Sequence, residues 1–249
     1  MKMNFSKQSG FSLVELMVAG LLGLLLLGGV ISVFMGSKRS FTMQEQLANL
    51  QTDGRFAMLY IEQTARNSGW FEGAIDSSAD AVMPVDIALS SEGADGAPDA
   101  ITFVRQAIVD TGIDCNGSTV TGRVVRNRFF QQNNSLFCQG NGGAAAQPVI
   151  NNIETFQVLY GVDNDGDAVV DTYIDAGDVS TGALTGSVIA VQIGLVVRSD
   201  ENFSFDVPAT TINVLDESFD FTDNRIRRNF SKTIAMPNAA FAIISSPSQ

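Results

Sequence analysis

The feature that most constrains this chain is one apolar run near its start. Residues 11–35 read FSLVELMVAGLLGLLLLGGVISVFM and contain a single charged side chain, that of Glu15. As an α-helix this run is roughly 37 Å long, which exceeds the ~30 Å hydrocarbon core of a bilayer. It is too long for the apolar part of a secretory signal peptide, and no small-residue cleavage site follows it. We therefore expect a membrane-spanning helix rather than a buried core helix.

A plain membrane anchor leaves Glu15 unexplained. A carboxylate inside a transmembrane helix costs about 2.5–3.5 kcal/mol on insertion scales, so we expect it to have a functional partner. If the chain is cut after Gly10, Phe11 acquires a free α-amine four positions before Glu15. The amine of a neighbouring subunit is then a cation that can pair with the carboxylate within the lipid.

The segment Gly10-Phe11-Ser12-Leu13-Val14-Glu15-Leu16 resembles the class III signal of type IV pilins and type II secretion pseudopilins. The resemblance rests on the glycine, the phenylalanine, the spacing to the glutamate and the long apolar run. It implies that a prepilin peptidase cuts between Gly10 and Phe11, that Phe11 is N-methylated, and that Glu15 sets the register of assembly. It also implies four parts: a leader peptide (1–10), the transmembrane half of a helix (11–35), the soluble half of that helix (36–69) and a β-rich periplasmic domain (70–249).

Charge alone does not fix the topology. Lys2 and Lys7 precede the apolar run, whereas Lys38 and Arg39 follow it, so the positive-inside count is equal on the two sides. The resemblance resolves this, because pilins leave the leader in the cytoplasm and the large domain in the periplasm. The implied location is therefore the bacterial inner membrane, crossed once, with incorporation into a pilus.

Small residues recur within the apolar run. Gly28, Ser32 and Gly36 are four positions apart and therefore share one helix face, where the backbones of two helices can approach closely. The alternative is that glycine is simply common in membrane helices. Both interpretations stay open.

The helix is predicted to continue beyond the membrane, because the first proline of the chain is Pro84. An apolar stripe at three-to-four-residue spacing supports it: Leu47, Leu50, Ala57, Ile61 and Ala65. Asn67-Ser68-Gly69 is a suitable end, with the glycine in position for a left-handed cap. The segments 54–59 and 65–73 resemble the end of this helix in PilW-type minor pilins.

The remainder is predicted to form strands and turns, with a loop region at residues 74–98. The strand candidates are enriched in β-branched and aromatic residues and are bounded by turn residues. They are Ala100–Val109, Ser118–Phe130, Val149–Tyr160, Val169–Ile174, Val188–Val197, Thr210–Leu215 and Arg225–Ala235. Val188–Val197 is almost wholly apolar, as in a central strand. The predicted fold class is α+β, a long N-terminal helix packed on an antiparallel β-sheet domain.

The only two cysteines, Cys115 and Cys138, lie 23 positions apart. In an oxidising periplasm we expect them to form a disulfide, which contributes about 3 kcal/mol in the chain-entropy model. The alternative of a reactive thiol is weaker, because no neighbouring residue in the sequence would lower a thiol pKa.

One segment has the spacing of a calcium loop. Its positions 1, 3, 5 and 9 carry the carboxylates of Asp163, Asp165, Asp167 and Asp171. Position 7 would contribute the backbone carbonyl of Val169. Ca²⁺ is therefore the one candidate cofactor.

Two positions of this segment depart from the calcium-loop pattern. Ala168 stands where the loop requires glycine, and Ile174 replaces the bidentate glutamate, for which Asp175 is a possible substitute. The alternative is a solvated acidic turn, since Asn-Asp-Gly-Asp is also ordinary turn chemistry.

Composition excludes several classes of function. Aspartate and glutamate number 27 against 15 lysines and arginines, a net charge of −12 that disfavours nonspecific binding of nucleic acid. The chain contains no histidine, which removes Ser-His-Asp and Cys-His catalysis and histidine metal sites. A carboxylate pair could still act in acid–base catalysis, but no spacing singles one out. We therefore expect no enzyme.

The resemblance implies a minor pilin, of the PilW type, that primes assembly of the pilus fibre. Its implied partners are other minor pilins, the major pilin, the prepilin peptidase, the inner-membrane assembly platform and membrane lipid. Two alternatives stay open. One is a type II secretion pseudopilin, which shares the leader and the helix; the other is a pilus-tip adhesin whose acidic domain binds a surface.

Overall fold

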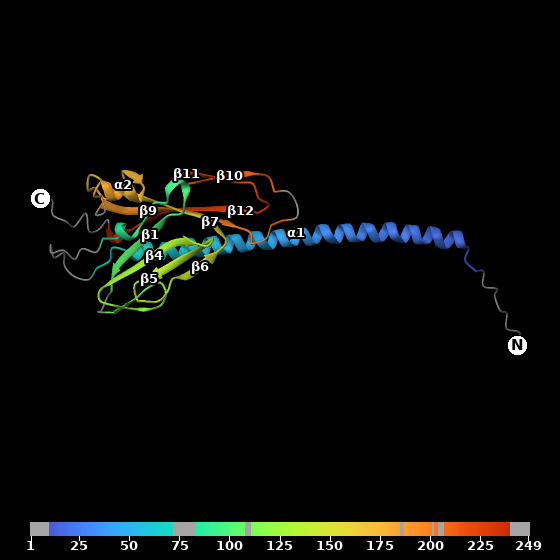
Figure 1. Cartoon of the computed structure of the whole chain (residues 1–249), viewed down its shortest axis with the longest axis horizontal. Helices are drawn as coiled ribbons and strands as arrows, with labels where there is room; N and C mark the ends of the chain where they lie inside the picture. Colours follow the sequence, from blue (N-terminus) through green and yellow to red (C-terminus); the bar gives the residue numbers. More distant parts are fainter. Residues whose placement is uncertain are drawn as a thin grey trace. The chain divides into compact units, whose positions relative to one another are not determined.

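The computed structural model describes residues 10–71, 83–107, 111–184, 187–200, 202–203 and 207–239 (Figure 1). Contacts divide the chain into two compact units, residues 1–46 and 47–249, and each is treated by itself here. The predicted leader residues before Gly10, including Lys2 and Lys7, lie outside the described residues. So do residues 72–82 and 108–110, which include parts of the predicted loop and of the first predicted strand.

The first unit consists of the start of helix α1, which runs from Leu13 to Asn67. Among the described residues, α1 is the one helix long and apolar enough to cross a membrane, and its most apolar stretch is entirely unburied. Side chains such as Leu24 and Phe34 are 70% and 68% exposed. A helix that is apolar around its whole circumference suits a lipid environment. A helix with the length and apolar surface of the predicted membrane span is thus present, and the span itself stays a prediction.

In the second unit, α1 buries one face in the core. The buried residues recur every three or four positions and include most of the predicted stripe: Leu50, Gly54, Ala57, Met58, Ile61 and Ala65. The helix ends where predicted. Gly69 has φ +71°, which glycine adopts without strain, and its N–H donates to the Val104 carbonyl at 2.8 Å.

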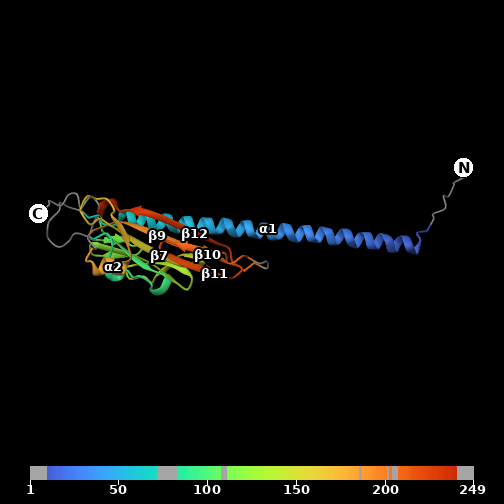
Figure 2. The same ribbon diagram turned by 90° about the horizontal axis from the view of Figure 1, so that it is seen from above.

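Gly54 allows strand β12 (Arg227–Ala235) to approach α1 closely. A Cβ at this position would collide with the ring of Phe230 from β12. Figures 1 and 2 both show β12 running beside this part of α1. A glycine at this position makes the helix about 1 kcal/mol less stable than an alanine would. The space that the Phe230 ring needs explains why position 54 is nevertheless a glycine.

Two four-stranded antiparallel sheets form most of the second unit. The first has the order β1-β4-β5-β6 and consists of Ala100–Gln106, Val124–Gln132, Ser135–Gly140 and Gln147–Asn151. The second has the order β12-β9-β7-β8, in which β9 is Val188–Arg198, β7 is Ile153–Val162 and β8 is Thr172–Ile174. All strand pairs between the described residues are antiparallel, which confirms the predicted fold class.

Smaller elements complete the unit. Two hairpins pair β2 (Thr111–Ile113) with β3 (Thr119–Thr121) and β10 (Thr210–Val214) with β11 (Glu217–Phe221). The helical elements are the short helix α2 (Ala176–Thr181) and the 3₁₀ turns η1 (Ile87–Leu89) and η2 (Ala94–Gly96). The two 3₁₀ turns lie in the segment predicted as a loop.

The central position predicted for Val188–Val197 is confirmed, since β9 lies between β12 and β7. Two other predictions were wrong about continuity. The predicted strand Ser118–Phe130 is two strands, because the chain turns at Gly122, where φ is +100°. The predicted strand Val149–Tyr160 is interrupted at Asn152, where φ is +60°. A strand cannot continue through a left-handed residue.

The structure also contains elements that the sequence did not predict, namely β2, β5, β11 and α2. The turn between β4 and β5 is formed by Asn133 and Asn134, with φ of +49° and +57°. Two left-handed residues between paired strands are typical of a type I′ hairpin, whose usual signal is Asn-Gly. The predicted strand Val169–Ile174 shortens to β8, because residues 169–171 belong to the acidic loop before it.

The core of the second unit lies where α1 meets both sheets. Phe129 of β4 makes edge-to-face contacts with Phe103 of β1 and with Tyr60 of α1, at centroid distances of 6.1 and 5.8 Å. Ile61 and Phe156 are completely buried in the same cluster. The helix is therefore a structural part of this unit.

A buried carboxylate joins this core to the loop before β1. Asp99 is 3% exposed, and its two oxygens accept hydrogen bonds from the N–H groups of Gly93 (2.8 Å) and Val158 (2.7 Å). Burial is the main cause that raises the pKa of Asp99 to about 6; the two hydrogen bonds oppose the rise, and the nearby carboxylates of Asp216 and Asp175 add to it.

We predict that Gly54→Leu destabilises the second unit although leucine is the better helix former. Overpacking against the Phe230 ring should cost about 1–3 kcal/mol of unfolding free energy. Chemical denaturation of the full chain in detergent micelles measures this loss of unfolding free energy. Phe230→Ala creates room for the leucine, so the double variant should lose less than the sum of the two single losses. Additive losses would contradict the proposed contact.

We predict that the unfolding free energy falls between pH 4 and pH 7 because of Asp99 and Glu92. The pKa of Asp99 is about 6 in the folded chain and 3.8 ordinarily, and that of Glu92 is about 7 and 4.5 ordinarily, so the folded chain binds more protons in this range and stability decreases as the pH rises. Glu62, Asp163 and Asp223, whose pKa values are lowered, act in the opposite direction at and below their ordinary pKa values, in the most acidic part of this range and below it. The measurement is the denaturation midpoint at several pH values, and Asp99→Asn should flatten its slope. An unchanged slope in that variant would contradict the assignment.

Candidate functional site

The predicted cleavage site lies just before the first turn of α1. Gly10 and Phe11 precede the helix, Phe11 is 84% exposed, and no described atom lies within 4 Å of where a Gly10 side chain would begin. The bond between them is therefore sterically open to a peptidase. Processing and methylation stay predictions.

Glu15 lies in the first turn of α1, and no cation of the described residues pairs with it. Ser12 caps this turn: its hydroxyl accepts a hydrogen bond from the Glu15 N–H at 3.3 Å, and its carbonyl accepts one from Leu16 at 3.2 Å. Ser12-Leu13-Val14-Glu15 has the spacing of a capping box, a signal that the sequence analysis missed. A carboxylate in the first turn also interacts favourably with the helix dipole.

The small-residue face of α1 is unoccupied within this chain. No described atom lies within 4 Å of a Cβ placed on Gly28 or Gly36, and Ser32 is exposed. The helix-packing role of these three residues therefore stays a prediction.

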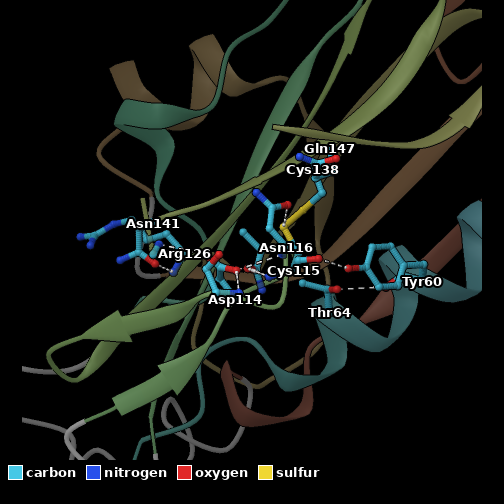
Figure 3. Close-up of a disulfide and its surroundings, with 12 residues drawn as sticks. Tyr60, Thr64, Asp114, Cys115, Asn116, Arg126, Cys138, Asn141 and Gln147 are labelled. Atoms are coloured by element: carbon cyan, nitrogen blue, oxygen red, sulfur yellow. Dashed lines mark hydrogen bonds between the residues drawn. A yellow bond between two sulfur atoms is a disulfide. The ribbon is translucent and has the colours of Figure 1, made fainter. Parts of the chain in front are cut away.

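The predicted disulfide is present and is linked to α1 (Figure 3). Cys138 is buried on β5, and Cys115 lies in the turn between β2 and β3. The Cys115 N–H donates to Asn127 at 2.8 Å, and its carbonyl accepts a hydrogen bond from the Tyr60 hydroxyl at 2.8 Å. The disulfide thus belongs to a connection from the first sheet to the helix. No pattern in the sequence predicts the hydrogen bond of Tyr60 to this turn.

Asp114, the residue before the first cysteine, holds the same turn together (Figure 3). One oxygen accepts hydrogen bonds from the N–H groups of Asn116 and Ser118, both at 2.9 Å, and the other accepts from Gly142 at 2.8 Å. The carboxylate therefore joins the β2–β3 turn to the segment after β5. This role is structural.

The acidic loop brings together three of its four predicted carboxylates. One oxygen each from Asp163, Asp165 and Asp171 lies within 4.8 Å of the others, but Asp167 is not part of this group. Its carboxylate instead accepts a hydrogen bond from the N–H of Val169, whose side chain is 60% exposed. The described residues therefore offer a cluster of three carboxylates.

The backbone of the loop follows the calcium-loop pattern in one respect and departs from it in another. Ala168 has φ +64°, the conformation for which such loops use glycine. Ile174, at the position of the bidentate glutamate, is the last residue of β8 and pairs with Tyr160. Asp175, the suggested substitute for the glutamate, caps α2 by accepting a hydrogen bond from the Asp178 N–H at 2.7 Å and is not part of the cluster of three carboxylates.

Electrostatics within the cluster differ from one carboxylate to the next. Burial raises the pKa of Asp163, but hydrogen bonds from backbone N–H groups, including those of Gly166 and Ala168, lower it below its ordinary value. For Asp165, a hydrogen bond from Asp167 lowers the pKa, but repulsion from the neighbouring carboxylates raises it above its ordinary value. A bound cation would relieve this repulsion.

A comparison with family models agrees with the N-terminal signal. Residues 116–238 match the model of a family described as type IV pilus-assembly protein W, PilW. Among solved structures, a type IV-like pilin of Thermus thermophilus superposes with a TM-score of 0.48 and 15% identity, over 79% of this chain and 96% of that chain. No curated protein matches this sequence.

The family match lies wholly outside the N-terminal signal, so two separate parts of the chain indicate the same class of protein. The resemblance to PilW-type minor pilins is thereby supported: residues 116–238 match the PilW family model, and a long apolar N-terminal helix precedes them.

Proposed function

We propose that this chain is a minor pilin that inserts into the inner membrane and, together with other minor pilins, primes assembly of the major pilin into a type IV pilus. The observation that carries the proposal is Glu15, a carboxylate with no cationic partner among the described residues, in the first turn of an exposed apolar helix. Two residues separate the predicted cleavage site from the start of that helix.

Cleavage after Gly10 would give each subunit one cation and one anion at nearly the same depth in the membrane. The cation is the α-amine of Phe11, and the anion is the carboxylate of Glu15. Within one chain the amine precedes the first helical residue, so the helix does not hold it against its own carboxylate. It can therefore pair with the Glu15 carboxylate of a neighbouring subunit as readily as with that of its own chain. Pairing between subunits lowers the cost of keeping both charges in lipid and fixes the axial register of two helices.

The partners follow from this mechanism. The prepilin peptidase would act on the Gly10–Phe11 bond, and the inner-membrane assembly platform would receive the processed chain. The face of Gly28, Ser32 and Gly36 would allow close packing against the helices of other pilins. The disulfide between Cys115 and Cys138 is consistent with a periplasmic second unit, because disulfides persist in oxidising compartments.

The type II secretion pseudopilin stays the nearest alternative, because it would use the same leader and the same helix. Restoration of piliation in a mutant that lacks the native gene would favour the pilus, whereas restoration of protein secretion alone would favour the pseudopilin. No catalytic step is part of the proposal.

We predict that Glu15→Val leaves the chain in the membrane and correctly processed but reduces surface piliation about tenfold or more, because the pairing of charges between subunits is lost. The measurement is the number of pili in cells without a wild-type copy. Glu45→Gln is the matched control, since Glu45 is an exposed carboxylate on the same helix. Gly10→Leu should instead leave an unprocessed precursor band. Normal piliation with Glu15→Val would contradict the pairing role.

Calcium binding at the loop of Asp163, Asp165 and Asp171 also stays a prediction, which the clustering of their oxygens makes testable. Titration of the chelator-treated full chain with Ca²⁺, followed by calorimetry, should show binding at millimolar concentration or tighter. Asp171→Asn should weaken it about tenfold, whereas Asp178→Asn, outside the cluster, should not. If the wild-type chain takes up no Ca²⁺ at millimolar concentration, the segment is a solvated acidic turn.

A further inference from the structure

A cavity of about 460 Å³ lies on the first sheet, on the face turned away from the core. Residues of β4 alternate between buried and half-buried, so that Arg126 and Arg128 point to this face while Asn127 points inward. The segment around η1 forms the opposite wall and contributes Leu89 and Ser91. We refer to this site, lined by Arg126, Arg128, Leu89, Ser91 and Gln139, as the arginine cavity.

Both guanidinium groups are held in place through a single nitrogen. The Nε of Arg128 donates to the Leu89 carbonyl at 3.1 Å, and the Nε of Arg126 donates to Asp86 Oδ2 at 2.9 Å. The terminal amino groups of both arginines have no protein partner among the described residues. Two planar donors are thus positioned in advance, with the edges that form bidentate contacts left available.

The arginine cavity also carries uncompensated positive charge. Asp86 neutralises Arg126, but no carboxylate of the described residues pairs with Arg128. Its guanidinium instead lies 4.7 Å from the ring centroid of Phe130, which in turn stacks on Phe137 of β5 at 5.9 Å. The aromatic ring fixes the plane of the guanidinium without cancelling its charge. In a chain of net charge −12, such a site favours one anionic group.

Neutral polar groups lie beside the two cations. Gln139 stands directly opposite Arg128 in the strand register, and its amide has no partner among the described residues. The hydroxyl of Ser91 is likewise without a described partner, while its backbone is fixed by bridging to Ala100. Leu89, 49% exposed, adds an apolar surface. Asn141 is not available, because its side chain accepts from the Arg126 N–H and donates to the Val124 carbonyl.

We propose that the arginine cavity binds a carboxylated sugar residue of an acidic polysaccharide. The sugar carboxylate accepts hydrogen bonds from the terminal amino groups of Arg128 and Arg126. Its hydroxyls bond to Gln139 and Ser91, and the apolar side of its ring lies on Leu89. The volume suits one or two sugar rings and is within the usual range of small-ligand sites. The backbone amides of an acidic peptide could also bond to Gln139 and Ser91, so triglutamate is the competing ligand in the test.

This inference does not depend on the proposed role in priming, since the site lies on the first sheet and uses none of the membrane residues. It names a class of ligand, an acidic polysaccharide, for the alternative of a surface-binding adhesin that the sequence left open. It also needs no calcium, because the acidic loop contributes none of the residues that line the cavity.

The test is a titration of the full chain in detergent micelles with trigalacturonate, followed by calorimetry. The expected result is saturable binding at millimolar concentration or tighter, weakened at high salt, with none to the neutral trisaccharide maltotriose. Arg128→Gln should weaken binding about tenfold. Arg228→Gln is the matched control, because Arg228 is an exposed arginine on β12, outside the cavity.

Two further variants separate ligand contacts from folding. Arg128→Lys keeps the charge but loses the planar fork, and should weaken binding. Gln139→Ala removes an exposed amide that holds no described element in place, and should weaken binding several-fold with an unchanged denaturation midpoint. Equal affinity of the Arg128→Gln and Arg228→Gln variants would overturn the proposal. So would equally tight binding of triglutamate or inorganic phosphate, or no binding of trigalacturonate by the wild-type chain.

Discussion

The second unit depends on the contact between α1 and the edge strand β12. Gly54 removes the side chain that would keep the two apart, and Phe230 fills the space. Further along the same pair, Lys232 of β12 forms an ion pair with Glu62, which also pairs with Arg66 one turn later. One helix thus supplies both the apolar run and this packing face.

The apolar run imposes a second constraint of a different kind. It accepts one carboxylate, and that carboxylate lies in the turn where a helix dipole and a serine cap favour it. These local contacts explain why Glu15 is compatible with the start of a helix. They do not supply a positive charge, and the described part of the chain contains none beside it. The position of Glu15 is therefore the basis for proposing a partner molecule, and it favours the proposal of assembly over catalysis or simple anchoring.

The sequence predicted the parts of the structure that depend on local pattern. The span and end of α1, the central position of β9 and the disulfide follow from periodicity, an apolar run and the presence of only two cysteines. The sheet order did not follow, because it depends on contacts between distant segments. The breaks at Gly122 and Asn152 were missed because single left-handed residues interrupt stretches of otherwise good strand formers. Of the candidate site, the acidic cluster was largely foreseen. The arginine cavity was not, since the groups that orient its arginines come from about 40 positions earlier in the chain.

The central claim is that processing creates the cation that Glu15 requires. The most direct test is mass spectrometry of the N-terminal peptide of the chain purified from inner membranes. The account predicts a mature chain that begins at Phe11 and carries one methyl group on its α-amine. A mature chain that begins at any other residue would contradict it, because the amine would then lie at the wrong distance from the carboxylate.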